Sequence, residues 1–279
     1  MKLKKMLSEG LLISAPGVFD PISAKVSESC GANSLYMTGY GVSASLLGKP
    51  DAGLVSYREM VDRVRCISDV TQLPLIADGD TGFGGLANVK QAVQGYESAG
   101  ANAIQLEDQE YPKRCGHTKN RKVIPSEDMV KKIKVAALSR SSRDFLIIAR
   151  TDARTEHGLD EAMRRSETYI KAGADILFLE SPESIEEMCS VAERFPEIPK
   201  LANMVNGGKT PVLTDGELKD LGYQIVIHPV YLLGAAVQGM RFALNHLLNN
   251  EKELDTVADL NDLNHLVDFP AVWALDEID

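Results

Sequence analysis

The strongest constraint on the fold is an alternation that runs through most of the chain. Short apolar runs recur, and a loop and a stretch with helical periodicity follow most of them. The apolar runs cover residues 11–15, 34–38, 73–78, 102–107, 145–150, 175–180, 199–203 and 224–228. Several are apolar at nearly every position, which is typical of strands buried on both faces of a parallel sheet.

Helical candidates lie between these runs, over residues 57–70, 86–99, 126–138, 159–172, 184–195 and 232–248. Gly100, Gly173 and Gly222 stand at expected helix ends, where a left-handed residue is favoured. Eight strands with helices between them predict an α/β fold, a (β/α)8 TIM-type barrel. An open doubly wound sheet is the rival, but no G-x-G-x-x-G follows the first run.

We expect the catalytic barrel to cover residues 1–250 and a C-terminal helical extension to cover residues 251–279. The extension carries a series of apolar residues and the single tryptophan, Trp273. Two interpretations stay open for it. Its apolar side packs as a lid on its own barrel, or it docks on a partner subunit.

Composition excludes several classes of function. The net charge is −10 and no basic block occurs, which argues against a nucleic-acid surface. The apolar runs are too short for a membrane span or a signal segment. Four cysteines without paired spacing argue against disulfides and zinc, and for a reducing compartment. We therefore predict a cytoplasmic protein with neither nucleic acid nor membrane as a partner.

Acidic side chains mark the ends of two neighbouring strands, where the active site of a barrel lies. Asp78 and Asp80 follow the third run, and Glu107 ends the fourth. Residues two apart in a strand share a side, so the two aspartates converge. Such a pair favours a cation, and oxygen ligands suit Mg²⁺, with Mn²⁺ as a substitute. The alternative is an Asp-Gly turn with solvated carboxylates.

Charged residues also end the fifth and sixth runs, at Arg150 and Glu180. An arginine there offers a planar fork for a substrate carboxylate. The alternative is a structural ion pair that closes the mouth of the barrel.

The polar stretch 112–122 is too long for a minimal turn and is typical of a loop at an active site. Within it, Cys115 stands beside Lys113, Arg114 and His117, and positive neighbours favour the thiolate form. We interpret Cys115 as a general acid, because a nucleophile would need a base and zinc a second ligand pair. An inert buried thiol is the alternative.

Taken together, the motifs resemble the isocitrate lyase/phosphoenolpyruvate mutase superfamily over nearly the whole chain. The loop at Lys113-Arg114-Cys115-Gly116-His117 is similar to its lyase branch, which contains the 2-methylisocitrate and 2,3-dimethylmalate lyases. Phosphonomutases carry an asparagine-containing loop there instead. The other motifs are Thr38-Gly39-Tyr40-Gly41-Val42, Asp78-Gly79-Asp80-Thr81-Gly82, Leu106-Glu107-Asp108-Gln109 and Ala149-Arg150-Thr151-Asp152-Ala153.

The resemblance implies Mg²⁺-dependent cleavage of a carbon–carbon bond in a 2-hydroxy acid by a retro-aldol, Claisen-type route. It also implies a homotetramer whose C-terminal helices are exchanged between subunits. It assigns the metal to Asp78, Asp80 and Glu107, with Asp51 behind them. It assigns catalysis to Cys115, Lys113, Arg150 and Glu180, with Cys115 protonating the enediolate. It assigns substrate binding to Tyr36, Thr38, Gly39, Tyr40, Arg114, Gly116, His117, Asn203 and Pro229.

The acid that is cleaved depends on the stretch after the seventh run. Methylisocitrate lyases typically show Asn-Ile-Thr-Glu-Phe-Gly there, whereas this chain has Met204, Val205 and Asn206 after Asn203. Fewer polar groups favour a more apolar leaving half, as in 2,3-dimethylmalate, which would give pyruvate and propionate. Pro229 resembles the alkylmalate and methylisocitrate cleavers, while oxaloacetate-hydrolysing members carry serine. Alternatively, Pro229 only shapes a loop.

Three rival functions remain. An oxaloacetate decarboxylase would use the same metal and pyruvyl site. A phosphonomutase-type enzyme is the second rival. The third is a catalytically silent barrel that binds small diacids, in which Gly207-Gly208-Lys209 forms a phosphate-binding turn. For the enzyme, the expected partner is a small-molecule di- or tricarboxylate substrate.

Overall fold

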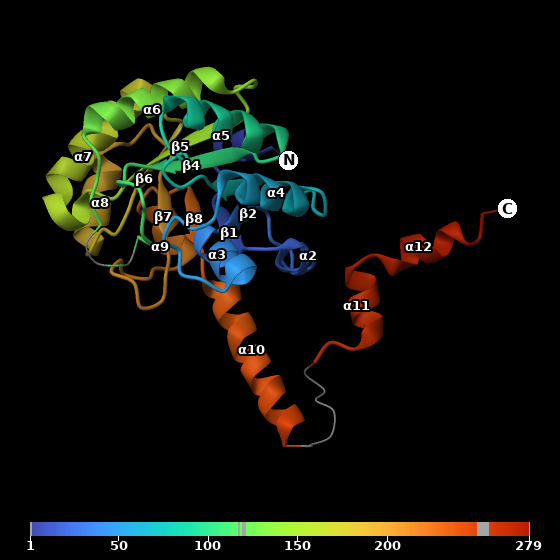
Figure 1. The fold of residues 1–279 in the computed structure, drawn as a ribbon. Helices are drawn as coiled ribbons and strands as arrows, with labels where there is room; N and C mark the ends of the chain where they lie inside the picture. Colours follow the sequence, from blue (N-terminus) through green and yellow to red (C-terminus); the bar gives the residue numbers. More distant parts are fainter. Residues whose placement is uncertain (1, 117, 119–120, 250–256, 279) are drawn as a thin grey trace. The chain divides into compact units, whose positions relative to one another are not determined.

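The computed structural model describes residues 2–116, 118, 121–249 and 257–278. Within these residues, eight parallel strands form a nearly closed barrel surrounded by helices, which confirms the predicted fold (Figure 1). The strands are paired in the order β6-β5-β4-β3-β2-β1-β8-β7, and a bridge between Leu177 and Lys200 joins the two end strands. The strands are β1 Ile13–Val18, β2 Leu35–Met37, β3 Leu75–Asp78, β4 Ala103–Glu107, β5 Leu146–Thr151, β6 Ile176–Leu179, β7 Leu201–Asn203 and β8 Ile225–His228.

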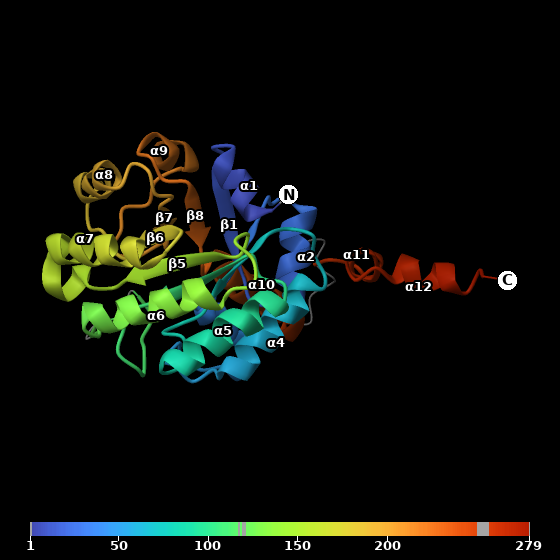
Figure 2. The same cartoon turned by 90° about the horizontal axis from the view of Figure 1, so that it is seen from above.

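The outer helices follow the strands in sequence, and Figure 2 shows α4 to α7 along the outside of the sheet. Three short helices, α1, α2 and α3, were not predicted, and only the end of α9 was indicated, by Gly222. Strand β1 begins two residues later than expected. Helix α7 contains Gly158 at φ 83°, so its regular part begins where the periodicity placed it. The helices of the barrel are α1 Leu3–Ser8, α2 Pro21–Ser29, α3 Gly39–Leu47, α4 Tyr57–Ser68, α5 Leu86–Ser98, α6 Ser126–Ser139, α7 Arg154–Ala172, α8 Ile185–Arg194 and α9 Asp215–Asp220.

Two apolar layers hold the barrel together, because successive strand residues point alternately inward and outward. The outward layer packs against the helices. The inward layer fills the barrel, and α1 adds Leu3 and Met6 to it. Inward-facing residues include Tyr36 on β2, Ile76 on β3, Ala103 on β4, Ile148 on β5 and Phe178 on β6. Residues two or four positions further along each strand therefore face the same interior, at the mouth of the barrel.

The chain divides into two compact units, Met1–Leu232 and Leu233–Asp279. The second unit contains most of α10 (Tyr231–Leu248), together with α11 (Leu260–Leu266) and α12 (Phe269–Leu275). The domain boundary that we predicted between residues 250 and 251 lies outside the described residues and stays a prediction. Among the helices that the structure describes, none combines the length and apolar character needed to cross a membrane.

Candidate active site

Five strand ends bring charged or amide side chains into the mouth of the barrel. Each of these side chains is buried and follows an inward-facing residue by two or four positions. They belong to Asp78, Glu107, Arg150, Glu180 and Asn203. Strand register aligns Glu107 with Arg150 on neighbouring strands. The side-chain alternation along these strands therefore collects the predicted residues at one place.

The turn after β3 is fixed by hydrogen bonds to its backbone and its first carboxylate. The Oδ1 atom of Asp78 accepts a hydrogen bond from the backbone N–H of Asp80 at 3.0 Å. The Tyr96 hydroxyl donates to the carbonyl of Asp78 at 2.9 Å, and Lys132 Nζ donates to the carbonyl of Thr81 at 2.8 Å. Asp80 itself lies in the left-handed region, at φ 49°. The two aspartates are thus held by the surrounding helices.

Lys113 connects the loop after β4 to this turn. Its Nζ lies 2.5 Å from Asp51 Oδ1 and 2.7 Å from Asp80 Oδ1, and its side chain is 3% exposed. Burial alone would lower the pKa of Lys113, but Asp80 and Asp51 together raise it well above its usual value. Burial, opposed by Lys113, raises the pKa of Asp80 to about 7. Lys113 is therefore a fixed cation that ties the loop to the acidic turn.

Arg150 sits among three carboxylates on the other side of the mouth. Its guanidinium donates to both oxygens of Asp152 at 2.9 Å and stacks over the Phe178 ring at 5.1 Å. It also lies 3.4 Å from Glu107 Oε2 and 3.5 Å from Glu180 Oε2. Burial disfavours its charge, yet Asp152 and Glu107 raise the pKa of Arg150 well above its usual value. The structural ion pair foreseen as an alternative is present, and a role toward substrate stays a prediction.

Glu180 and Asn203 are joined directly. Asn203 Nδ2 donates to Glu180 Oε2 at 3.1 Å, and Ser181 Oγ donates to Glu180 Oε1 at 2.9 Å. Ser181 Oγ also lies 3.4 Å from the Gly116 carbonyl. These contacts connect the ends of β6 and β7 to the loop that carries Cys115.

That loop approaches the mouth so closely that only glycine fits at Gly116. A Cβ atom there would collide with a guanidinium nitrogen of Arg150 and lie 3.0 Å from Glu180 Cδ. The neighbouring Cys115 is partly buried, and Thr118 donates to its carbonyl at 2.8 Å. The loop that carries Cys115 therefore reaches the Arg150–Glu180 pair through Gly116, and the role of Cys115 as a general acid stays a prediction. His117 lies outside the described residues.

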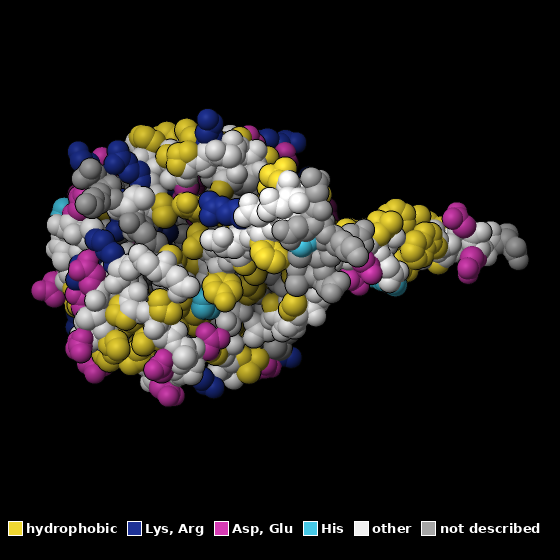
Figure 3. Space-filling view, turned by 90° about the horizontal axis from the view of Figure 1, so that it is seen from below, with side chains coloured by type: hydrophobic (Ala, Val, Ile, Leu, Met, Phe, Trp, Pro, Cys, Tyr) yellow, Lys and Arg dark blue, Asp and Glu magenta, His cyan; other side chains and the backbone are white. Residues whose placement is uncertain are grey.

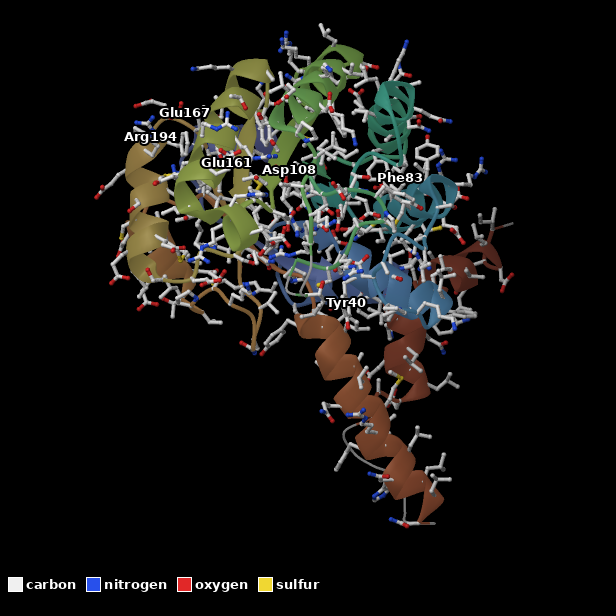
Figure 4. The ribbon with its side chains drawn as sticks, turned by 60° about the vertical axis from the view of Figure 1, so that its left-hand side comes forward. Tyr40, Phe83, Asp108, Glu161, Glu167 and Arg194 are labelled. Atoms are coloured by element: carbon white, nitrogen blue, oxygen red, sulfur yellow. The ribbon has the colours of Figure 1, made fainter. Side chains whose placement is uncertain are left out.

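The predicted pyruvyl pocket lies at the start of α3. Thr38 Oγ1 accepts from the N–H of Gly41 at 3.3 Å and caps the helix. A Cβ atom at Gly39 would lie 2.6 Å from Asp78 Oδ2, so glycine lets the backbone approach the carboxylate. Tyr40, on the same helix, has a 40% exposed side chain and is labelled in Figure 4. Tyr36 is fully inside the barrel.

Two further predicted residues make close backbone contacts in the structure. The N–H of Arg114 donates to Gln109 Oε1 at 3.0 Å, and Gln109 Nε2 donates to the Arg114 carbonyl at 2.9 Å. The backbone of Pro229 packs against Gly17 so closely that a Cβ atom there would collide with it. The sequence alone suggested neither contact.

Four buried residues that the prediction missed support the site. Asp152 and Arg121 form a buried ion pair next to Arg150, and Gln109 holds the loop at Arg114. Gln105 lies between Tyr36 and Asp78. Gln105 and Asp152 had a usable signal, since Gln105 precedes Glu107 by two residues and Asp152 follows Arg150 by two. Gln109 stood in a quoted motif without a role, and the place of Arg121 depends on loop geometry.

Comparison with known proteins places this site in a family. A family model described as phosphoenolpyruvate phosphomutase matches residues 3–248. The chain belongs to the phosphoenolpyruvate mutase/isocitrate lyase superfamily. This confirms the resemblance drawn from the motifs.

Two relatives and one solved structure within this superfamily are close to the chain. The 2,3-dimethylmalate lyase of Eubacterium barkeri is 46% identical over 95% of this chain and 93% of its own length. The 2-methylisocitrate lyase of Aeropyrum pernix is 40% identical over 92% of this chain and 82% of its own. A crystal structure of a 2,3-dimethylmalate lyase superposes with a TM-score of 0.94 at 34% identity, covering 98% of this chain and 92% of that one. These proteins share the lyase branch that the loop motif indicated.

The residues at the mouth fit a hard divalent cation of the kind predicted for the superfamily. In the described part of the chain, no three Asp, Glu, His or Cys side chains converge closely enough to hold a metal alone. However, Glu107 Oε1 is buried without a hydrogen-bond partner among these residues, and Asp78 Oδ2 faces the Gly39 backbone. Magnesium usually keeps several waters and takes few protein oxygens. A partly hydrated ion therefore suits this donor set.

Proposed function

We propose that this chain is a Mg²⁺-dependent carbon–carbon lyase. It cleaves a 2-alkylmalate such as 2,3-dimethylmalate, or 2-methylisocitrate, to pyruvate and a carboxylate, propionate or succinate. The observation that carries the proposal is the position of the loop around Cys115. Its loop meets the acidic turn through Lys113 and Asp80, and meets the Arg150–Glu180 pair through Gly116. The likeness to two lyases over nearly the whole chain supports the same reaction.

Each side of the mouth has its own task in this proposal. Asp78, Asp80 and Glu107 hold Mg²⁺ directly or through water, and the ion stabilises negative charge on the oxygens of the substrate. Thr38 and Gly39 bind the half that becomes pyruvate. Tyr36 and Tyr40 are assigned to substrate binding beside them.

Arg150, Glu180 and Asn203 hold the leaving half, together with His117. The C2 hydroxyl loses its proton to solvent and becomes the carbonyl of pyruvate as the bond between C2 and C3 breaks. The electrons of that bond move to the leaving half, which becomes an enediolate. Cys115 then donates a proton to the C3 carbon. Lys113 keeps its charge and stabilises the anionic turn instead of moving a proton, because its pKa lies well above the usual range.

A diacid is the better substrate on charge grounds. Arg154, the arginine that follows β5, is already paired with Glu183 at 2.7 Å and Glu187 at 2.5 Å. Lys209, in the loop after β7, lies 3.4 Å from Glu183. A third substrate carboxylate would have to compete with these ion pairs, which disfavours a tricarboxylate. We therefore place 2,3-dimethylmalate ahead of 2-methylisocitrate.

We further propose a homotetramer, built from dimers that exchange C-terminal helices, in the cytoplasm. No residue of α10 is buried, although Met240, Phe242 and Leu247 are large and apolar. Hydrophobic side chains gather along the C-terminal segment in Figure 3. On the barrel, a groove of about 370 Å³ is bordered by Pro16 and Val26, among other residues. A second copy's helix would cover such surfaces.

The test is pyruvate release from 2,3-dimethylmalate, 2-methylisocitrate and oxaloacetate, each with Mg²⁺ and with a chelator. We expect cleavage of 2,3-dimethylmalate that needs Mg²⁺ and falls by at least a hundredfold in Cys115→Ala, because general acid catalysis is typically worth about that much. The matched control is Cys189→Ala, a partly buried cysteine on α8 away from the mouth.

The rival functions give different results. Pyruvate from oxaloacetate alone, unaffected by Cys115→Ala, would make the protein a decarboxylase. Conversion of phosphonopyruvate would favour the mutase-type enzyme. Binding of all three acids without any turnover would leave only a diacid-binding barrel.

A further inference from the structure

Gln105 joins the substrate pocket to the acidic turn inside the barrel. The Tyr36 hydroxyl donates to Gln105 Oε1 at 3.0 Å, and Gln105 Nε2 donates to Asp78 Oδ1 at 3.3 Å. Gln105 is 0% exposed, Tyr36 2% and Asp78 5%. The three side chains come from β4, β2 and β3, which are neighbouring strands, so the barrel itself holds them in line.

The chemistry of these groups permits only one direction for the two hydrogen bonds. An ionised carboxylate only accepts, so the amide must turn its NH₂ group toward Asp78. Its carbonyl oxygen then faces Tyr36, whose hydroxyl has to donate. Burial, together with the charge of Asp78, raises the pKa of Tyr36 well above its usual value, so the hydroxyl keeps its proton.

Asp78 Oδ1 is fully engaged by this arrangement. It accepts from Gln105 at 3.3 Å and from the N–H of Asp80 at 3.0 Å. The other oxygen, Oδ2, is the one that faces the backbone of Gly39. The side chain of Asp78 therefore cannot rotate without losing two hydrogen bonds inside a buried site, where such losses are costly.

We propose that Gln105 is a positioning residue for the metal, because it orients Asp78 so that Oδ2 is the ligating oxygen. This inference rests on the proposed Mg²⁺ site. It also limits the role of Tyr36, because the single hydroxyl proton of Tyr36 is donated to Gln105. Tyr36 can meet a bound acid only as a hydrogen-bond acceptor, which leaves the protonation step to Cys115.

The experiment measures Mn²⁺ affinity by the paramagnetic resonance signal of free Mn²⁺ in the full-length protein. Gln105→Met keeps the length of the side chain but removes both hydrogen bonds. We expect it to weaken Mn²⁺ binding by roughly tenfold or more, the usual cost of losing a partner behind a metal ligand. Gln105→His restores one donor and one acceptor in the neutral imidazole, and we expect affinity within roughly threefold of the wild type.

Gln109→Met is the matched control. Gln109 is also a buried glutamine that follows β4, but its side chain bonds the backbone of Arg114 in the loop and the carboxylate of Asp152. We expect this change to leave Mn²⁺ affinity unaltered while it slows turnover. Tyr36→Phe weakens Mn²⁺ binding in the wild-type background and has no further effect in Gln105→Met, since Tyr36 acts on Asp78 through the amide.

Each outcome separates the two proposals. If the wild-type protein binds no Mn²⁺ at all, the proposed metal site fails. If the wild type binds and Gln105→Met binds within twofold of it, the positioning role is wrong. Equal losses in Gln105→Met and Gln105→His, with correct folding by circular dichroism, would also overturn it, because packing alone would then explain the effect.

Discussion

Glu107 and Asp108 are consecutive buried carboxylates on opposite sides of the barrel wall. Asp108 points outward to the helices, and its oxygens accept from Thr151 at 2.8 Å, Tyr169 at 2.8 Å and the N–H of Asp152 at 2.9 Å, with Arg165 at 3.2 Å. Glu107 points inward, where Arg150 lies at 3.4 Å. Figure 4 shows Asp108 on the side of the helix that carries Glu161.

Burial alone does not distinguish these two residues, since it raises the pKa of both carboxyls. Their partners do. The charge of Asp108, which faces the helices, is satisfied by several hydrogen-bond donors, as is usual for a buried structural group. The mouth leaves Glu107 Oε1 without a hydrogen-bond partner among the described residues. A buried carboxylate with spare acceptor capacity is therefore the better indicator of a ligand site.

The largest effect should come from removing the Asp108 carboxylate, which faces the helices. Asp108→Ala removes the acceptor for Thr151 and Tyr169 and leaves Arg165 without its buried partner. We expect the free energy of unfolding to fall by about 3–5 kcal/mol, as for other broken buried charge pairs. Urea unfolding measures it, with Glu107→Ala as the paired variant. A loss in Asp108→Ala no larger than that in Glu107→Ala would contradict the contrast.

A smaller effect of opposite sign should appear at the mouth. Burial holds the pKa of Glu107 well above its ordinary value, so ionising it in the folded protein costs stability as the pH rises. Glu107→Gln removes that cost. We expect the metal-free variant to be more stable than the wild type by about 1 kcal/mol at pH 8.

This advantage should disappear as the pH falls into the ordinary glutamate range, where the carboxyl is protonated in both states. Thermal unfolding at several pH values in a chelator tests it. Lower stability of Glu107→Gln at pH 8 would show that the Arg150 ion pair outweighs burial.

The smallest effect concerns Glu161, on helix α7. Arg164 donates to its carboxylate at 2.6 Å and Arg165 at 2.8 Å, and these bonds, led by that of Arg164, lower the pKa of Glu161 to about 2. The folded state therefore gains stability above the unfolded pKa and loses it as the pH falls from about 4.5 toward 2.

Glu161→Gln should lower stability by less than about 1 kcal/mol at pH 6, because the pair is partly exposed and screened. The difference from the wild type should vanish near pH 2. A deficit that stays constant over this pH range would mean that packing, and not charge, explains it. The pH profiles of Glu161→Gln and Glu107→Gln should thus run in opposite directions.

Long helices were predictable and short helices were not. The helices predicted at 57–70 and 86–99 correspond to α4 and α5 within two residues. Helices α1 and α9, of six residues each, left no usable period. Helices this short gain their stability from tertiary packing rather than from local propensity. In α1, that packing is the contact of Leu3 and Met6 with the barrel interior.

The sequence by itself determined which residues stand at the strand ends and which way they face. A period of two and a parallel sheet are local rules, so Asp78, Glu107 and Arg150 could be placed at one mouth without coordinates. Only the tertiary structure decided their partners. Lys113 reaches Asp51 and Asp80, and Gln105 separates Tyr36 from Asp78. Such contacts join residues far apart in the chain, and the closure of the barrel, not any local pattern, brings them within hydrogen-bonding distance.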